Sequence, residues 1–137
     1  MRCAIPDAID DDAAVLIEPL AAALRGVATI GPQAGQSIAV LGPRKLGMLA
    51  VATLAAWRRH SVDMRIVAMA RRPDLLAIAR EMGRRKPSTP HPAHHSKVDV
   101  VIDCTGSPEG LETAIETAKS EIHLKSTHGR PAAGLSA

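Results

Sequence analysis

The 137-residue sequence has almost no aromatic side chains: it contains no Phe, no Tyr and a single Trp. Its core must therefore be built mainly from Ala, Leu, Val and Ile, which pack well but provide few large anchors. The sequence also lacks any run of about 18 apolar residues, the length that a membrane-spanning helix needs, so we expect no membrane partner. With 46% hydrophobic residues, the composition is that of one globular domain.

Cysteine is scarce as well. Cys3 and Cys104 lie about a hundred residues apart and form no spacing typical of a metal or redox site. The first residues turn acidic and do not resemble a signal peptide. A reduced, cytoplasmic chain is the simplest interpretation.

Charge is unevenly distributed along the chain, although the net charge is only +3. Residues 1–20 hold five acidic side chains and one Arg, whereas residues 43–86 hold eleven Arg or Lys and three acids. The basic block contains no interleaved aromatic residues for base stacking, so we expect no nucleic-acid partner. Two interpretations remain open: a site for the phosphates of a small cofactor, and a solvated Arg-rich face.

Hydrophobic patterning predicts alternating strands and helices. Short apolar or β-branched segments predict strands at residues 37–41, 64–69, 98–103 and 121–125. Helices are predicted at residues 10–24, 47–57 and 73–82, and after Ser107 and Pro108, with apolar positions at Leu111, Ala114, Ile115 and Ala118. This order predicts an α/β fold with an incomplete parallel sheet of about four strands, preceded by an N-terminal helix.

The remaining segments are expected to be irregular. Pro19 should kink the first helix, and residues 26–35 are rich in turn formers. Residues 84–97 contain three prolines and predict an exposed loop where such a sheet would normally place a further edge strand. That strand is therefore expected to be missing or vestigial.

The first strand ends in a glycine turn that precedes the long helix. Gly42 and Gly47 have the spacing of the first and third glycines of G-x-G-x-x-G, and Arg44 occupies the middle position. In such a turn the free N–H groups of the helix receive a pyrophosphate. The expected dinucleotide contacts here are Gly42, Pro43, Arg44, Lys45, Leu46 and Gly47.

The ends of the later strands offer further contacts, because a parallel sheet binds ligands at its carboxyl edge. At the second strand, Ala70 stands where an NAD site has an acidic residue, and Arg71 and Arg72 follow it. This replacement favours NADP over NAD, unless both arginines are only solvated charges. The end of the third strand contributes Cys104 and Thr105, and the end of the fourth strand contributes Ser126 and Thr127.

Four segments, E-P-L-A-A-A-L, V-L-G-P-R-K-L-G-M-L, D-V-V-I-D-C-T-G-S-P-E-G-L and L-K-S-T, occur in this order between residue 5 and about residue 129. Together they resemble the medium-chain dehydrogenase/reductase superfamily, most of all its zinc-dependent alcohol, sorbitol and threonine dehydrogenase branch. The resemblance implies a Rossmann-like NAD(P)-binding domain at residues 37–129. Residues 1–36 would then be a helix and connector at the edge of a catalytic domain, and residues 130–137 a tail.

In that family the nucleotide-binding domain is joined to a GroES-like catalytic domain, which carries most zinc ligands and the substrate pocket. The segments that hold catalytic zinc are not found in these 137 residues, and Ser120 replaces a glycine that the family often has. Glu18 matches a glutamate that ligates or lies beside zinc in relatives, so zinc is expected only if a GroES-like domain or subunit supplies the other ligands.

The resemblance therefore implies the NADP- or NAD-binding part of an alcohol-dehydrogenase-like oxidoreductase, unable to transfer hydride alone. The alternative is a non-catalytic nucleotide-binding or interaction module, a degenerate remnant. The substrate stays open.

Two other candidate sites are weaker. His91, His94 and His95 have a helical spacing, but the prolines around them disfavour a helix and no Cys or acid completes a ligand set. Cys104 ends a buried strand without a neighbouring histidine in the sequence, so we interpret it as a small core residue and not as a nucleophile.

Overall fold

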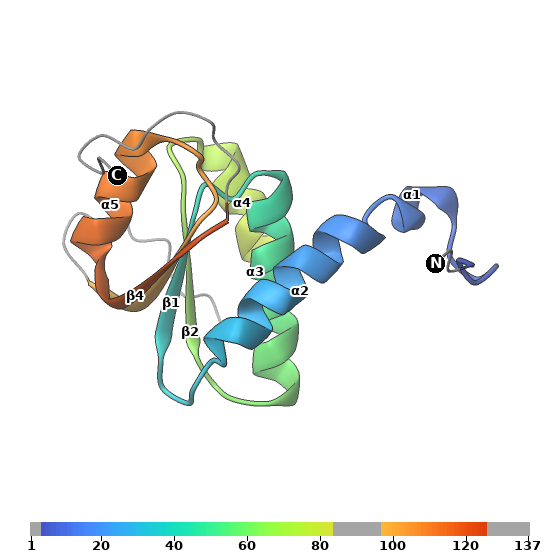
Figure 1. The fold of residues 1–137 in the computed structure, drawn as a ribbon, viewed down its shortest axis with the longest axis horizontal. Coiled ribbons are helices and arrows are strands. Elements are labelled where there is room, and N and C mark those ends of the chain that lie inside the picture. Colours follow the sequence, from blue (N-terminus) through green and yellow to red (C-terminus); the bar gives the residue numbers. More distant parts are fainter. Residues whose placement is uncertain (1–3, 84–96, 126–137) are drawn as a thin grey trace, which may run out of the picture.

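A computed structural model describes residues 4–83 and 97–125 of the chain. Its centre is a four-stranded, all-parallel sheet with the strand order β2-β1-β3-β4 (Figure 1). The strands are β1 (Ser37–Leu41), β2 (Arg65–Met69), β3 (Val98–Asp103) and β4 (Ala118–Leu124). The α/β class and the incomplete parallel sheet expected from the sequence are thus confirmed.

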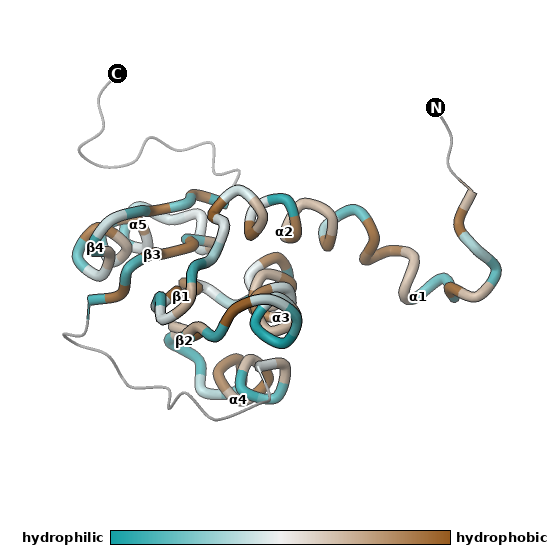
Figure 2. The backbone as a smooth tube through the Cα atoms, turned by 90° about the horizontal axis from the view of Figure 1, so that it is seen from below, coloured by the Kyte–Doolittle hydropathy of each residue, from teal (hydrophilic) through white to brown (hydrophobic). Residues whose placement is uncertain are grey.

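Five helices are described: α1 (Asp11–Ala14), α2 (Ile17–Ile30), α3 (Lys45–His60), α4 (Pro73–Met82) and α5 (Pro108–Thr117). Side chains of α2, α3 and α4 form one apolar core with one face of the sheet, where Ile38 and Leu54 are fully buried. A smaller core lies on the other face of the sheet and includes Val101 of β3 and Ala114 of α5. Figure 2 shows α2, α3 and α4 stacked along one side of the strands. None of the helices in the described ranges is long and apolar enough to cross a membrane.

All five residues of β1 are buried, because β1 lies inside the sheet between β2 and β3 and both of its faces are covered. This burial explains why the strand reads as a continuous apolar run in the sequence, as strands of parallel sheets do. Strand β2 forms one edge of the sheet in the part of the chain that the structure describes. The predicted loop at residues 84–97 lies outside that part except for Lys97.

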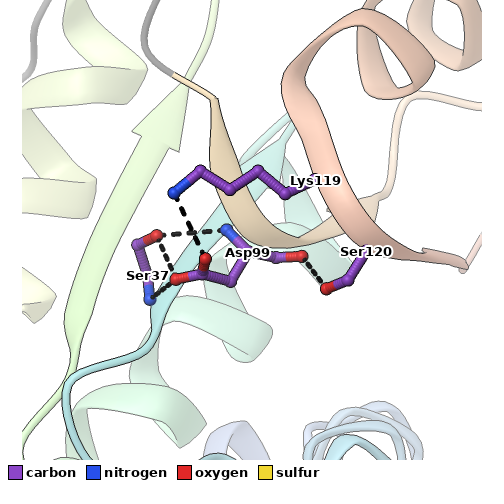
Figure 3. A network of polar contacts seen from close by, with 4 residues as sticks. All are labelled: Ser37, Asp99, Lys119 and Ser120. Atoms are coloured by element: carbon purple, nitrogen blue, oxygen red, sulfur yellow. Dashed lines mark hydrogen bonds and ion pairs between the residues drawn. The ribbon is translucent and has the colours of Figure 1, made fainter.

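Polar side chains tie together the amino ends of three strands (Figure 3). The Asp99 carboxylate accepts hydrogen bonds from the Ser37 backbone N–H at 2.8 Å and from the Ser37 hydroxyl at 2.7 Å. Lys119 Nζ lies 3.3 Å from the other carboxylate oxygen, and the Ser120 hydroxyl donates to the Asp99 carbonyl. These hydrogen bonds, with Lys119, lower the pKa of Asp99 to about 2. The network fixes strand register at the end of the sheet opposite the carboxyl edge.

The prediction of one kinked helix at residues 10–24 is wrong. The chain forms two helices that are separated at Val15 and Leu16, and α2 continues to Ile30. Pro19 lies in the first turn of α2 and has no N–H to donate to the Val15 carbonyl four residues before it, so the disruption expected from this proline coincides with the break at Val15 and Leu16.

The turn expected from residue 26 is also misplaced, because Gly26 lies inside α2. A Cβ at Gly26 would lie 2.8 Å from Cε of Lys125, the far end of a flexible side chain that can move aside. The helix ends at Gly31, whose φ of 58° is left-handed, as is common for helix-ending glycines. Similarly, Ala118 is not a helical position: α5 ends at Thr117 and β4 begins at once, earlier than residue 121.

Candidate functional site: the glycine turn at the carboxyl edge of the sheet

The glycine turn after β1 is closed by backbone contacts. Gly42 has a φ of +71°, and its N–H donates to the Met69 carbonyl at 3.0 Å, while its own carbonyl accepts from the Arg44 N–H at 2.7 Å. A Cβ at Gly47 would lie 2.5 Å from that Gly42 carbonyl oxygen. A side chain at Gly42 would meet Cγ2 of Thr105 at 2.9 Å. Both glycines are therefore required by the packing of the turn itself.

The first turn of α3 has open hydrogen-bond donors. Arg44 occupies the N-cap position, but its side chain makes no capping hydrogen bond. Within the described part of the chain, the N–H groups of Lys45, Leu46 and Gly47 have no backbone acceptor, whereas Met48 donates to the Arg44 carbonyl. Such a group of unsatisfied N–H donors at a helix start is suited to an anion.

The side chains of this turn differ in exposure. Pro43 is almost fully buried and Leu46 is partly buried, whereas Arg44 and Lys45 are exposed. The two cations therefore stand at the surface beside the open N–H groups and attract negative charge to them.

The end of β2 has two arginines in different situations. Ala70 is partly buried and carries no carboxylate, as the sequence indicated. Arg72 forms a two-point ion pair with Asp74, with Nε–Oδ1 at 3.1 Å. This hydrogen-bonded pair raises the pKa of Arg72 and lowers the pKa of Asp74. Arg71 is exposed and has no ion pair within residues 4–83 and 97–125, so its guanidinium is the more available of the two.

The end of β3 is held by a buried carboxylate. Asp103 is 2% exposed and accepts hydrogen bonds from the Thr105 N–H at 2.8 Å and from the Thr105 hydroxyl at 2.6 Å. An Asp that accepts a hydrogen bond from the N–H two residues later forms an Asx turn, so the D-C-T spacing could have revealed this role, which the sequence analysis missed. Burial, with the Asp103 charge beside it, raises the pKa of the Cys104 thiol to about 11. A thiol that stays protonated at neutral pH fits the interpretation of Cys104 as a core residue.

The structure brings three of the predicted strand ends together. The Cys104 N–H donates to the Leu41 carbonyl at 2.9 Å, and the Gly42 N–H donates to Met69. The glycine turn, the residues after β2 and those after β3 therefore share one edge of the sheet. Ser126, Thr127, His91, His94, His95 and Cys3 lie outside the described residues.

An apolar pocket opens beside this edge, between α2, α3 and the end of β3, and it was not foreseen from the sequence. Its lining includes Ala22, Gly26, Leu46, Cys104 and Lys125. Gly26 and Lys125 are 99 residues apart in the sequence, and no local pattern indicates that they meet.

Glu18, the candidate metal ligand, is exposed near the start of α2. No group of three or more His, Cys, Asp or Glu side chains that could hold a metal occurs in the described ranges. Glu18 thus has no ligand set there, and a metal at this residue would require ligands from elsewhere.

Solved structures similar to this chain are dehydrogenases. The 2R,3R-butanediol dehydrogenase from Bacillus subtilis is 26% identical with a TM-score of 0.71, and the match covers 93% of this chain and 39% of that one. A protein described as a zinc-binding dehydrogenase from Sinorhizobium meliloti 1021, solved with NADP, is 25% identical with a TM-score of 0.71, covering 96% and 41%. An alcohol dehydrogenase from Escherichia coli CFT073 in complex with NADH, 24% identical with a TM-score of 0.76, covers 95% and 41%. No family model matches the chain.

These comparisons confirm the resemblance to zinc-dependent alcohol dehydrogenases that the sequence motifs indicated. The chain spans about two fifths of the length of the dehydrogenases it matches.

Proposed function

We propose that this chain is the dinucleotide-binding part of an alcohol-dehydrogenase-like oxidoreductase. The observation that carries the proposal is the glycine turn, where packing excludes side chains at Gly42 and Gly47 and the N–H groups of Lys45, Leu46 and Gly47 are left open. Residues 37–129 would form the binding domain, residues 1–36 a connector and residues 130–137 a tail.

The cofactor's pyrophosphate would lie over the first turn of α3, where the open N–H groups and the helix dipole favour negative charge. The adenosine 2′-phosphate of NADP would lie near Arg71, with Arg72 contributing only if it leaves Asp74. We infer that NADP is preferred over NAD, since Ala70 offers no carboxylate for the ribose hydroxyls. The similar structures include one solved with NADP and one with NADH, which supports a nicotinamide dinucleotide, so the preference for NADP rests on Ala70 and Arg71.

The nicotinamide would extend toward Cys104 and Thr105 and toward Ser126 and Thr127, as the resemblance implies. When bound, the nicotinamide would supply the hydride chemistry. A GroES-like catalytic domain or subunit would supply the substrate pocket and the zinc ligands that could act together with Glu18. We therefore expect the 137-residue chain alone to bind the cofactor without oxidising alcohols.

A thermal-shift titration with NADP and NAD in parallel tests the proposal. A ligand that binds only the native state at a hundred times its Kd adds about 2.7 kcal/mol of stability. NADP is expected to raise the Tm more than NAD at equal concentration, and the difference should shrink as salt is added. The double variant Ala70→Asp with Arg71→Ser should reverse the order.

Arg80→Ser is the matched control, because Arg80 is an exposed arginine on α4 that has no role in the proposed site. It should leave both titrations unchanged. Equal shifts from the two cofactors would contradict the NADP preference, and no shift from either would contradict cofactor binding. Alcohol oxidation by the isolated chain, abolished by chelator and by Glu18→Ala, would show instead that the chain holds its own metal.

The alternative function is a non-catalytic nucleotide-binding or interaction module. One observation favours an interaction role: large apolar side chains are exposed along α2, among them Ile17, Leu20 and Leu24.

A further inference from the structure

The Lys125 ammonium stands in the wall of the apolar pocket beside the carboxyl edge of the sheet. In the register of β3 and β4, Asp103 lies opposite Leu124. The next residue after each strand, Cys104 and Lys125, therefore points to the opposite face, which α2 and α3 cover. Both side chains line the pocket. The end of the Lys125 side chain lies against α2, since a Cβ built at Gly26 would be 3.2 Å from Nζ.

No carboxylate pairs with this ammonium. Lys125 forms no ion pair with any residue of the described ranges. The Asp103 carboxylate accepts two hydrogen bonds from Thr105 and, by the alternation of the strand, lies on the face of α5. The Cys104 thiol is neutral, because burial and the Asp103 charge raise its pKa to about 11, and the Lys125 charge only opposes that rise. Arg25, the other charged residue of the lining, is also positive and is exposed to water.

The pocket adjoins the glycine turn. Leu46 contributes both to the lining of the pocket and to the open N–H groups at the start of α3. The pocket has a volume of about 230 Å³, which is less than whole cofactors and drug-sized ligands occupy but suits a single ring with one amide group. With the pyrophosphate over α3, the nicotinamide lies one ribose away, on the side of Cys104 and Lys125.

The oxidised and reduced forms of the cofactor differ in charge only at this ring. The nicotinamide is a cation in NADP⁺ and is neutral in NADPH, whereas the pyrophosphate, the riboses and the adenosine phosphate are the same in both. Like charges a few ångströms apart repel more strongly between apolar walls than in bulk water, because such walls screen less. An unpaired lysine ammonium in the pocket therefore acts against the oxidised ring alone.

We propose that Lys125 gives the site a preference for the reduced cofactor: its unpaired ammonium repels the cationic nicotinamide of NADP⁺ and leaves the neutral ring of NADPH unaffected. The inference rests on the proposed function, which brings the nicotinamide to the ends of β3 and β4. A site that holds NADPH more tightly is suited to the reduction of a carbonyl compound, since NADPH is the form that donates hydride.

Isothermal titration calorimetry of the 137-residue chain with three ligands tests the proposal: NADP⁺, NADPH and 2′-phospho-ADP-ribose, which lacks the nicotinamide. In the wild type, NADPH should bind with a Kd at least about tenfold lower than that of NADP⁺. NADP⁺ should bind no more tightly than the fragment, because its ring gains nothing from the pocket. These wild-type measurements require no variant to fold.

Three variants test whether the charge of Lys125 is the cause, with the ratio of the NADP⁺ and NADPH Kd values as the measure. Lys125→Met removes the charge but keeps an apolar chain, and it should bring the ratio to one. Lys125→Glu should reverse the order, because a carboxylate attracts the oxidised ring. Lys97→Met is the matched control: Lys97 is exposed before β3, at the amino edge of the sheet, and its replacement should leave the ratio as in the wild type. Circular dichroism melts establish that each variant is folded.

The outcomes separate this inference from the proposed function. Binding of the fragment together with equal Kd values for NADP⁺ and NADPH in the wild type would overturn the inference and leave the proposed function intact. Failure of all three ligands to bind would overturn both. A ratio that persists in Lys125→Met, or that falls equally in Lys97→Met, would overturn the inference alone, since the pocket charge would not be the source of the preference.

Discussion

Two strand–turn–helix units lie side by side in this protein and differ in how their helices begin. In one unit β1 leads through Gly42 into α3, and in the other β3 leads through Gly106 into α5. Both glycines are left-handed, with φ of 71° and 66°, and the two strands are neighbours in the sheet. At α5 the Ser107 hydroxyl accepts the Gly110 N–H at 3.0 Å, whereas no side chain caps α3.

The difference separates a structural turn from a turn suited to a ligand. Around α5, Asp103, Thr105 and Ser107 satisfy one another and the backbone. Around α3, the corresponding hydrogen bonds are available for an anion, because the turn consists of backbone packed against backbone at Gly42 and Gly47. A phosphate would therefore do at α3 what a serine side chain does at α5.

The largest effect on stability is expected from replacing the tightly packed glycine of each unit, Gly47 or Gly110, with alanine. Gly47→Ala places a Cβ 2.5 Å from the Gly42 carbonyl oxygen, a backbone atom that cannot move without opening the turn. We expect a loss of about 1–3 kcal/mol of stability and the disappearance of the NADP-induced rise in Tm. Thermal melts with and without NADP measure both effects.

Gly110→Ala is the matched variant in the other unit, since its Cβ would overlap the Thr105 hydroxyl. It should destabilise the chain similarly, because overpacking strains either turn. It should retain a rise in Tm with NADP, because the open N–H groups of α3 stay in place, although the rise should be smaller than in wild type since Thr105 is displaced. If Gly47→Ala kept the full NADP effect, the α3 turn would not be the phosphate site.

The sequence predicted the strands of both units, and the start of α5, correctly. Apolar β-branched runs located β1, β2 and β3 within a residue, and Pro73, Ser107 and Pro108 indicated where α4 and α5 begin. These signals are local, because propensity, capping and burial on both faces act within a few residues of the chain.

Contacts between distant segments were not predictable in the same way. Gly26 looked like a turn former, but it lies inside α2 beside the side chain of Lys125, a neighbour that only the folded chain reveals. Gly110 was not noticed because the Thr105 hydroxyl that excludes a side chain approaches it through the folded turn. The effect of Pro19 was predicted as a kink within one helix, whereas the helical run is broken at Val15 and Leu16. The apolar pocket was missed for the same reason, since three separate elements line it.

A smaller effect on stability is expected from replacing the N-cap residues of α5 and α3. Ser107→Ala removes the hydrogen bond to the Gly110 N–H and should lower the free energy of unfolding by about 1 kcal/mol. Arg44→Ala changes the equivalent position of α3, where no capping bond exists, and should leave stability almost unchanged in the absence of cofactor. Urea unfolding of both variants measures the difference. Equal losses would mean that Arg44 stabilises α3 by a contact that the structure does not show.

The hydrogen bonds of Asp99, at the amino ends of β1 and β3, should make the stability of the chain depend on pH in acid. Folding lowers the pKa of Asp99 to about 2 from its ordinary value of 3.8. A lowered carboxyl pKa stabilises the native state above about pH 4, and that stabilisation is lost as the pH falls toward 2. Asp99→Asn should therefore be less stable than wild type at pH 5.5, and the gap should narrow between pH 4 and pH 2.5 in urea unfolding curves. A gap that stays constant with pH would show that the Asp99 charge contributes nothing.

The smallest effect is expected from the residue that departs from the glycine-rich pattern. Arg44 occupies the middle position of the turn, where the backbone normally approaches the pyrophosphate, and its exposed side chain has no ion pair in the described part of the chain. If the side chain only obstructs this approach, Arg44→Gly should leave the NADP affinity unchanged or tighten it, since glycine is also acceptable at an N-cap. If the guanidinium instead binds phosphate, the same variant should weaken NADP about tenfold, which corresponds to about 1.4 kcal/mol. Isothermal titration calorimetry distinguishes the two. We expect the first outcome, because the open N–H groups of Lys45, Leu46 and Gly47 already provide a set of phosphate donors that requires no side chain.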